Sequence, residues 1–124
     1  MARRIRLFLT WEALIFFTAA LIHFGVFFGG YRDQGAGTAE GVIGGVLLLG
    51  LILSLIRPDW TPRIGLIVQG FALLGTFVGV TLLLTVGPRM VLDIVIHLVM
   101  VVILIVGLVI TARARPGLDS GSTG

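Results

Sequence analysis

Residues 90–112 read MVLDIVIHLVMVVILIVGLVITA, a run in which Asp93 and His97 are the only ionisable side chains. A helix needs about 20 mostly apolar residues to cross a hydrocarbon core about 30 Å thick. The run is therefore predicted to be a membrane-spanning helix that carries two costly polar groups.

Three further runs of this kind precede it, roughly at 7–29, 39–56 and 64–86. Short breaks that contain Gly or Pro together with polar residues separate the runs. Breaks this short make consecutive helices antiparallel neighbours. The sequence thus predicts an all-α bundle of four transmembrane helices in residues 1–112. The Gly- and Ser-rich segment 113–124 is predicted to be a flexible cytoplasmic tail.

The composition excludes several classes of protein. With 57% hydrophobic and 12% charged residues, the chain could not hide its apolar surface as a soluble globule. The net charge of +3 comes from nine arginines and no lysine. These arginines lie at segment ends and form no patch, so nucleic acid is not an expected partner. The lack of cysteine excludes disulfides, thiolate metal sites and thiol catalysis.

The distribution of arginine predicts the orientation, because short loops rich in arginine stay cytoplasmic. Two arginines, Arg32 and Arg89, fall on one side of the predicted bundle. The other side holds Arg3, Arg4, Arg6, Arg57, Arg63, Arg113 and Arg115. Both termini are therefore expected in the cytoplasm.

Helices in lipid associate through close approach at small residues, and the chain has several glycine pairs spaced four apart, such as Gly41 with Gly45 and Gly75 with Gly79. These pairs predict helix packing and leave room for a homo-oligomer.

A shift of 53 residues also matches Glu40 with Asp93, which suggests a duplicated two-helix unit.

Ionisable groups inside spanning segments are expensive and point to function. His23 and His97 are predicted at one depth, about 9–10 Å from the outer helix ends. Asp93 lies one turn above His97 on the same face and deeper than a cap, while Glu40 is expected in the first turn of its helix. These residues predict a funnel with carboxylates at the outer mouth and histidines beneath. Glu12, beside a tryptophan, is interpreted as interfacial.

Three chemistries fit this set of residues. Two neutral histidines with Asp93 and Glu40 would suit a divalent transition metal. The histidines could instead be axial ligands of a b-type haem, with Arg32 and Arg89 pairing its propionates. A series could also relay protons: it consists of Glu12, Gln69, Thr76, His23, His97 and Asp93.

The segments WEALIFFTAALIHFG (11–25) and GPRMVLDIVIH (87–97) lie in a chain that resembles the small bacterial four-helix membrane proteins of DoxX-like or uncharacterised type. The resemblance is architectural. It implies a bacterial inner-membrane protein and transfers no functional residue.

Three hypotheses about function follow. The leading one is a non-enzymatic membrane protein, a homo-oligomer or a subunit of a membrane complex, that binds a metal ion or protons at His23, His97, Asp93 and Glu40. The second is a haem-bearing or accessory subunit of an electron-transfer complex. The third is a purely structural subunit. No nucleophile elbow, zinc-protease motif or phosphate loop is present to suggest an enzyme.

Overall fold

The computed structural model describes residues 1–27, 29, 32–86 and 90–114. The long helices are α1 (Ala2–His23), α2 (Gln34–Ile56), α3 (Thr61–Thr85) and α4 (Val91–Arg113), with a short 3-10 helix, η1 (Pro58–Trp60), before α3. All four long helices are long and apolar enough to cross a membrane. The prediction of four transmembrane helices is confirmed to that extent, and by length and composition the chain is a multi-pass membrane protein.

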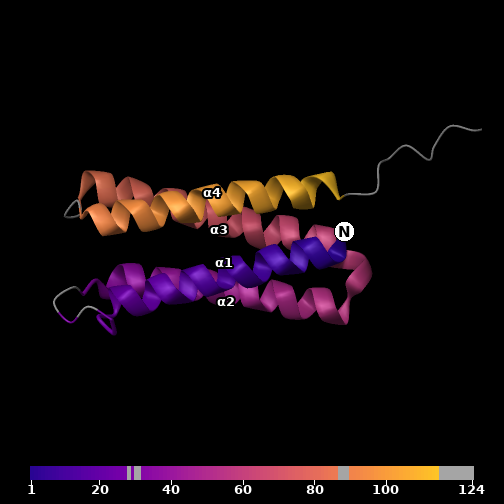
Figure 1. Cartoon of the computed structure of the whole chain (residues 1–124), viewed down its shortest axis with the longest axis horizontal. Coiled ribbons are helices and arrows are strands. Elements are labelled where there is room, and N and C mark those ends of the chain that lie inside the picture. The colour runs from indigo at the N-terminus through magenta and orange to yellow at the C-terminus, as the bar shows by residue number, and fades with distance from the viewer. Residues whose placement is uncertain (28, 30–31, 87–89, 115–124) are drawn as a thin grey trace, which may run out of the picture.

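The helices lie side by side in two pairs, α1 with α2 and α3 with α4 (Figure 1). The N-terminus and the end of α4 lie at the same end of the bundle, together with η1. We call this end the terminal end. At the opposite end α1 and α3 finish while α2 and α4 begin, and we call it the hairpin end.

The interior of the bundle is filled by apolar side chains, including Phe16, Leu47, Met100 and Leu104, each at most 1% exposed. Large apolar side chains also cover the outside of the bundle, as Ile67 and Leu98 do. This distribution suits a protein solvated by lipid, in which helix association depends on close packing.

Helix α1 ends at His23, although the apolar run had predicted a helix as far as residue 29. Gly25 adopts a positive φ of 79°. Its amide donates to Ile22 O (3.0 Å), and the Val26 amide donates to Leu21 O (3.1 Å). This is the Schellman arrangement that closes a helix, for which glycine is favoured because it lacks a Cβ.

Helix α2 begins at Gln34, five residues before the predicted start at Ala39. Asp33 is its N-cap, because the Asp33 side chain accepts a hydrogen bond from the Ala36 amide (3.0 Å). The Asp33 amide in turn donates to His23 O (2.8 Å). The end of α1 and the start of α2 are thereby held together at the hairpin end.

At the terminal end, Arg6 of α1 donates hydrogen bonds to Ser54 in the last turn of α2. Its Nη2 donates to Ser54 O (2.6 Å) and its Nε donates to Ser54 Oγ (3.2 Å). The last carbonyls of a helix have no partner within the helix and carry partial negative charge, so a guanidinium there is stabilising.

Candidate functional site

Four ionisable side chains from three helices meet near the hairpin end. His23 comes from the last residue of α1, Glu40 from α2, and Asp93 and His97 from α4. They are 0%, 5%, 6% and 9% exposed, respectively. We call this group the imidazole–carboxylate cluster. The structure therefore brings together all four residues that the sequence had singled out as a shared site.

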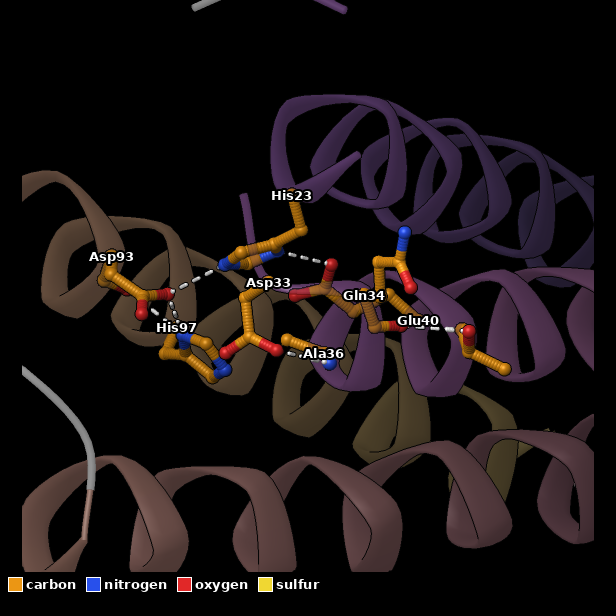
Figure 2. Close-up of polar contacts among 8 residues, drawn as sticks. His23, Asp33, Gln34, Ala36, Glu40, Asp93 and His97 are labelled. Carbon is orange, nitrogen blue, oxygen red and sulfur yellow. Dashed lines mark hydrogen bonds and ion pairs between the residues drawn. The ribbon is translucent and has the colours of Figure 1, made fainter. Parts of the chain in front are cut away.

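The His23 ring lies between two carboxylates. Its Nδ1 is 2.6 Å from Glu40 Oε2, and its Nε2 is 3.2 Å from Asp93 Oδ1. Figure 2 shows the ring placed between the Asp93 and Glu40 side chains, with one nitrogen directed at each. Both ring nitrogens are thus engaged by carboxylate oxygens of other helices.

His97 is fixed by its own helix and by Asp93. Its Nδ1 is 2.8 Å from the Asp93 backbone oxygen and 3.0 Å from Asp93 Oδ1. A backbone oxygen only accepts hydrogen bonds, so Nδ1 carries the proton and donates. The neutral ring then has its lone pair on Nε2. The two imidazole rings lie 6.4 Å apart, centre to centre.

For both contacts of His23 to be hydrogen bonds, the cluster must hold an additional proton. An ionised carboxylate only accepts hydrogen bonds, and a neutral imidazole donates from one nitrogen only. Two contacts between imidazole nitrogens and carboxylates therefore need either a doubly protonated His23 or a protonated Glu40 or Asp93. In both cases the cluster holds one proton more than a neutral histidine beside two carboxylates.

The predicted layering of the site is wrong in two details. Helix α4 begins at Val91, so Asp93 lies in its first turn, where the helix dipole favours a carboxylate. Helix α2 begins at Gln34, so Glu40 lies beyond the first turn and deeper than expected. The carboxylates consequently do not form a mouth above the histidines, because His23 lies between them.

A cavity of about 360 Å³ adjoins the cluster at the hairpin end. Glu40, Asp93 and His97 form the polar part of its wall, with Thr76 of α3. The remainder is mostly apolar or small, and Asp33 lies among the lining residues of the α2 start. The cluster therefore has a space beside it that a small molecule could occupy.

A second buried polar group lies closer to the terminal end. Glu12 is fully buried, and its Oε1 and Oε2 accept hydrogen bonds from Gln69 Nε2 (2.9 and 3.1 Å). Thr111 Oγ1 is 2.7 Å from Gln69 Oε1, to which it can donate. We call these three residues the glutamate–glutamine cluster. The interpretation of Glu12 as interfacial is therefore wrong, because Glu12 points into the bundle.

Sequence reasoning did not include Thr111 in this second cluster. The available signal was a hydroxyl in the last turns of an apolar helix, where a polar side chain needs a partner. Thr111 Oγ1 also lies 2.8 Å from Gly107 O in its own helix. A threonine in an apolar helix can satisfy its hydroxyl with such a local bond alone, without a partner on another helix. The sequence pattern could not distinguish the two.

The proposed relay residues divide between the two clusters. Glu12 and Gln69 contact each other, but Thr76 Oγ1 donates to Ala72 O in its own helix (2.7 Å). Between the clusters the buried side chains of α1, α3 and α4 are apolar: Phe16, Ala72, Met100 and Leu104. The described residues form two separate polar levels and not one continuous series.

The geometry favours neither a metal nor a haem. Within the described ranges, no three or more His, Cys, Asp and Glu residues are placed to hold a metal ion. A haem ligand needs a ring nitrogen directed at the iron, whereas both nitrogens of His23 face carboxylates. Arg32 is exposed, and Arg89 lies outside the described residues.

Comparison with protein-family models, with curated proteins and with solved structures finds no match to this chain. The resemblance to DoxX-like proteins stays a prediction.

Proposed function

We propose that this membrane protein binds and releases protons at the imidazole–carboxylate cluster. One observation carries the proposal: His23 has both ring nitrogens against carboxylates, an arrangement that requires an extra proton. Histidine is the side chain whose charge changes most readily near neutral pH, so it is suited to exchanging that proton.

The cavity offers a route by which the protons could be exchanged. It reaches from Asp33 and Ala36 at the start of α2 to Asp93 and His97 in α4. With the orientation that the arginines predict, both termini are cytoplasmic and the hairpin end faces the outside of a bacterial inner membrane. Protons would then enter and leave from the outer side.

Protons are a better match to this site than a metal ion. A metal takes a histidine through a nitrogen lone pair and releases the proton from that nitrogen. Here the His23 nitrogens face carboxylates and His97 Nδ1 faces a backbone oxygen. A metal that used His23 as a ligand would have to break the contact of that ring nitrogen with a carboxylate.

The experiment is a pH titration of the histidine ring nitrogens by nitrogen NMR in nanodiscs. The chain has two histidines, so ¹⁵N-histidine labelling reports on His23 and His97 alone. We expect the His23 ring to titrate. Asp93→Asn and Glu40→Gln should each move its midpoint by about one pH unit or more, because a hydrogen bond to a charged group contributes about 1.5–3 kcal/mol.

Asp59→Asn is the matched control, since Asp59 is exposed in η1 and remote from the cluster. It should leave the His23 curve unchanged. Identical curves for Asp93→Asn and the wild type would contradict the proposal. So would stoichiometric metal in the purified protein that is lost in both His23→Ala and His97→Ala.

A further inference from the structure

The cavity beside the cluster combines apolar walls with one acidic side. Ile43, Leu83 and Met100 contribute apolar surface, while Glu40, Asp93 and His97 contribute the polar side. Ligand sites in proteins have this character: mostly apolar walls, a few placed polar groups, and volumes of roughly 300–1,000 Å³. The volume of about 360 Å³ is at the lower end of that range and suits a small ligand.

One carboxylate oxygen in this wall lacks a partner. Glu40 Oε2 contacts His23, but Glu40 Oε1 is buried and has no hydrogen-bond partner within the described part of the chain. Glu40 is only 5% exposed. A buried acceptor without a donor is costly and uncommon in native proteins. Because Glu40 is one of the lining residues, a ligand in the cavity could supply the hydrogen-bond donor that Glu40 Oε1 lacks.

The charge of the cavity wall indicates which kind of hydrogen-bond donor would bind there. The lining includes the carboxylates of Asp33, Glu40 and Asp93, and among the residues that the structure describes it contains no arginine or lysine. In its neutral form His97 presents Nε2 as an acceptor, because Nδ1 is committed to the Asp93 backbone oxygen. A cation with N–H groups would satisfy both the charge and the missing donor, and such charge-assisted bonds are the stronger ones.

We propose that the cavity binds an organic ammonium ion, a protonated amine with an apolar body. The ammonium N–H groups donate to Glu40 Oε1 and face Asp93, while the apolar body lies against Ile43, Leu83 and Met100. This inference goes beyond proton binding by the cluster, because it assigns a ligand class to the cavity. The two share Glu40 and Asp93 but can be tested separately.

Other ligand classes match the cavity less well. An anion would face an acidic wall, because three acidic side chains outnumber the one additional proton of the cluster. An alcohol would donate one hydrogen bond without supplying charge, and a quaternary ammonium would supply charge without an N–H donor. Inside a membrane the electrostatic contribution is large because the surroundings have a low dielectric constant. A primary amine is the class that meets both requirements.

The experiment uses n-octylamine as the probe. Binding of radiolabelled octylamine to the full chain in nanodiscs is measured against empty nanodiscs, with n-octanol and octyltrimethylammonium as competitors. We expect saturable binding at one site per chain. Octyltrimethylammonium should compete at least about tenfold more weakly than unlabelled octylamine, because the hydrogen bond to Glu40 is lost, and octanol should compete more weakly still.

Variants separate cavity binding from proton binding. Gly79→Leu on α3 and Ala39→Leu on α2 add side chains to the cavity wall without removing any group of the cluster. We expect each to weaken octylamine binding about tenfold or more while the His23 titration persists. Gly70→Leu is the matched control, since Gly70 lies on α3 away from the cavity with no atom near its Cβ position.

Glu40→Gln tests the specific contact, and it should weaken octylamine binding by about tenfold or more, because the charge-assisted hydrogen bond is lost. The inference is overturned if octylamine binding does not exceed that of empty nanodiscs. It is also overturned if octyltrimethylammonium competes as well as octylamine, or if both cavity-filling variants bind as the wild type does. A wild type that binds octylamine while His23 fails to titrate would uphold this inference and overturn the proposed function.

Discussion

Contact between a histidine and two carboxylates lowers the electrostatic cost that each of these side chains would have alone inside a membrane-spanning segment. A single charge inside a membrane-spanning segment costs at least about 2.5–3.5 kcal/mol. His23 contacts Glu40 and Asp93 from opposite sides of its ring, so a proton shared among the three groups offsets part of their negative charge. The cost of burying these groups therefore falls, which is compatible with the proton exchange proposed for the cluster.

Glu12 gives a prediction at the scale of one residue. Glu12→Ala removes the acceptor of Gln69 Nε2 inside a fully buried site. An unsatisfied buried donor costs about 1–3 kcal/mol, so we expect the variant to lower the free energy of unfolding by at least that amount. Glu12→Gln keeps an acceptor for Gln69 and should lose less. Thermal or denaturant unfolding in detergent micelles measures both.

Leu14→Ala is the control for this comparison, because Leu14 lies on the same helix and is 52% exposed on the lipid-facing side. It should change stability little. Equal stability of Glu12→Ala and Leu14→Ala would show that the glutamate–glutamine cluster contributes nothing to folding.

At the residue scale, the sequence predicted which groups form the candidate site but not how they are arranged. His23, Glu40, Asp93 and His97 were identifiable because ionisable residues in apolar runs are rare. The placement of Glu12 was wrong because a neighbouring tryptophan suggested the interface. Periodicity could not show that Glu12 faces Gln69, since that contact joins residues 57 positions apart on different helices.

At the scale of helices, the ends were harder to predict than the spans. Each span is defined by about 20 apolar residues, which the sequence shows directly. The end of α1 depends on Gly25 adopting a positive φ, although Val26 and Phe27 continue the apolar run. That single backbone conformation places His23 at the helix end, where its carbonyl accepts from Asp33.

The contact between α2 and α3 gives a prediction at this scale. A Cβ added at Gly50 would lie 2.7 and 2.9 Å from the two Cγ atoms of Val68 on α3. Valine is β-branched and stiff, and Val68 is only 9% exposed, so it cannot turn aside freely. Gly50→Ala should therefore reduce the free energy of unfolding by about 1–3 kcal/mol, as overpacking typically does.

Gly45→Ala on the same helix is the matched control, because no atom lies within 4 Å of its Cβ position. It should be neutral or stabilise the protein by up to about 1 kcal/mol, since alanine favours the helix over glycine. If both variants destabilise equally in an unfolding experiment, close packing at Gly50 does not hold α2 against α3.

At the scale of the whole molecule, polar groups gather at two levels. The imidazole–carboxylate cluster lies near the hairpin end, and the glutamate–glutamine cluster lies toward the terminal end. The layer between them includes Phe16, Leu47 and Met100, each at most 1% exposed. Glu40 and Asp93, which a 53-residue shift pairs in the sequence, both contact His23, although duplication of a two-helix unit stays a prediction.

The orientation of the bundle is testable because the natural chain contains no cysteine. Single-cysteine variants Gln34→Cys and Asp59→Cys place a thiol at the start of α2 and in η1, respectively, at exposed positions that leave the arginine distribution unchanged. With the hairpin end outside, a membrane-impermeant maleimide added to intact cells should label Gln34→Cys. It should label Asp59→Cys only after lysis. The reverse pattern would place the cavity on the cytoplasmic side, so that protons and ammonium ions would reach it from within the cell.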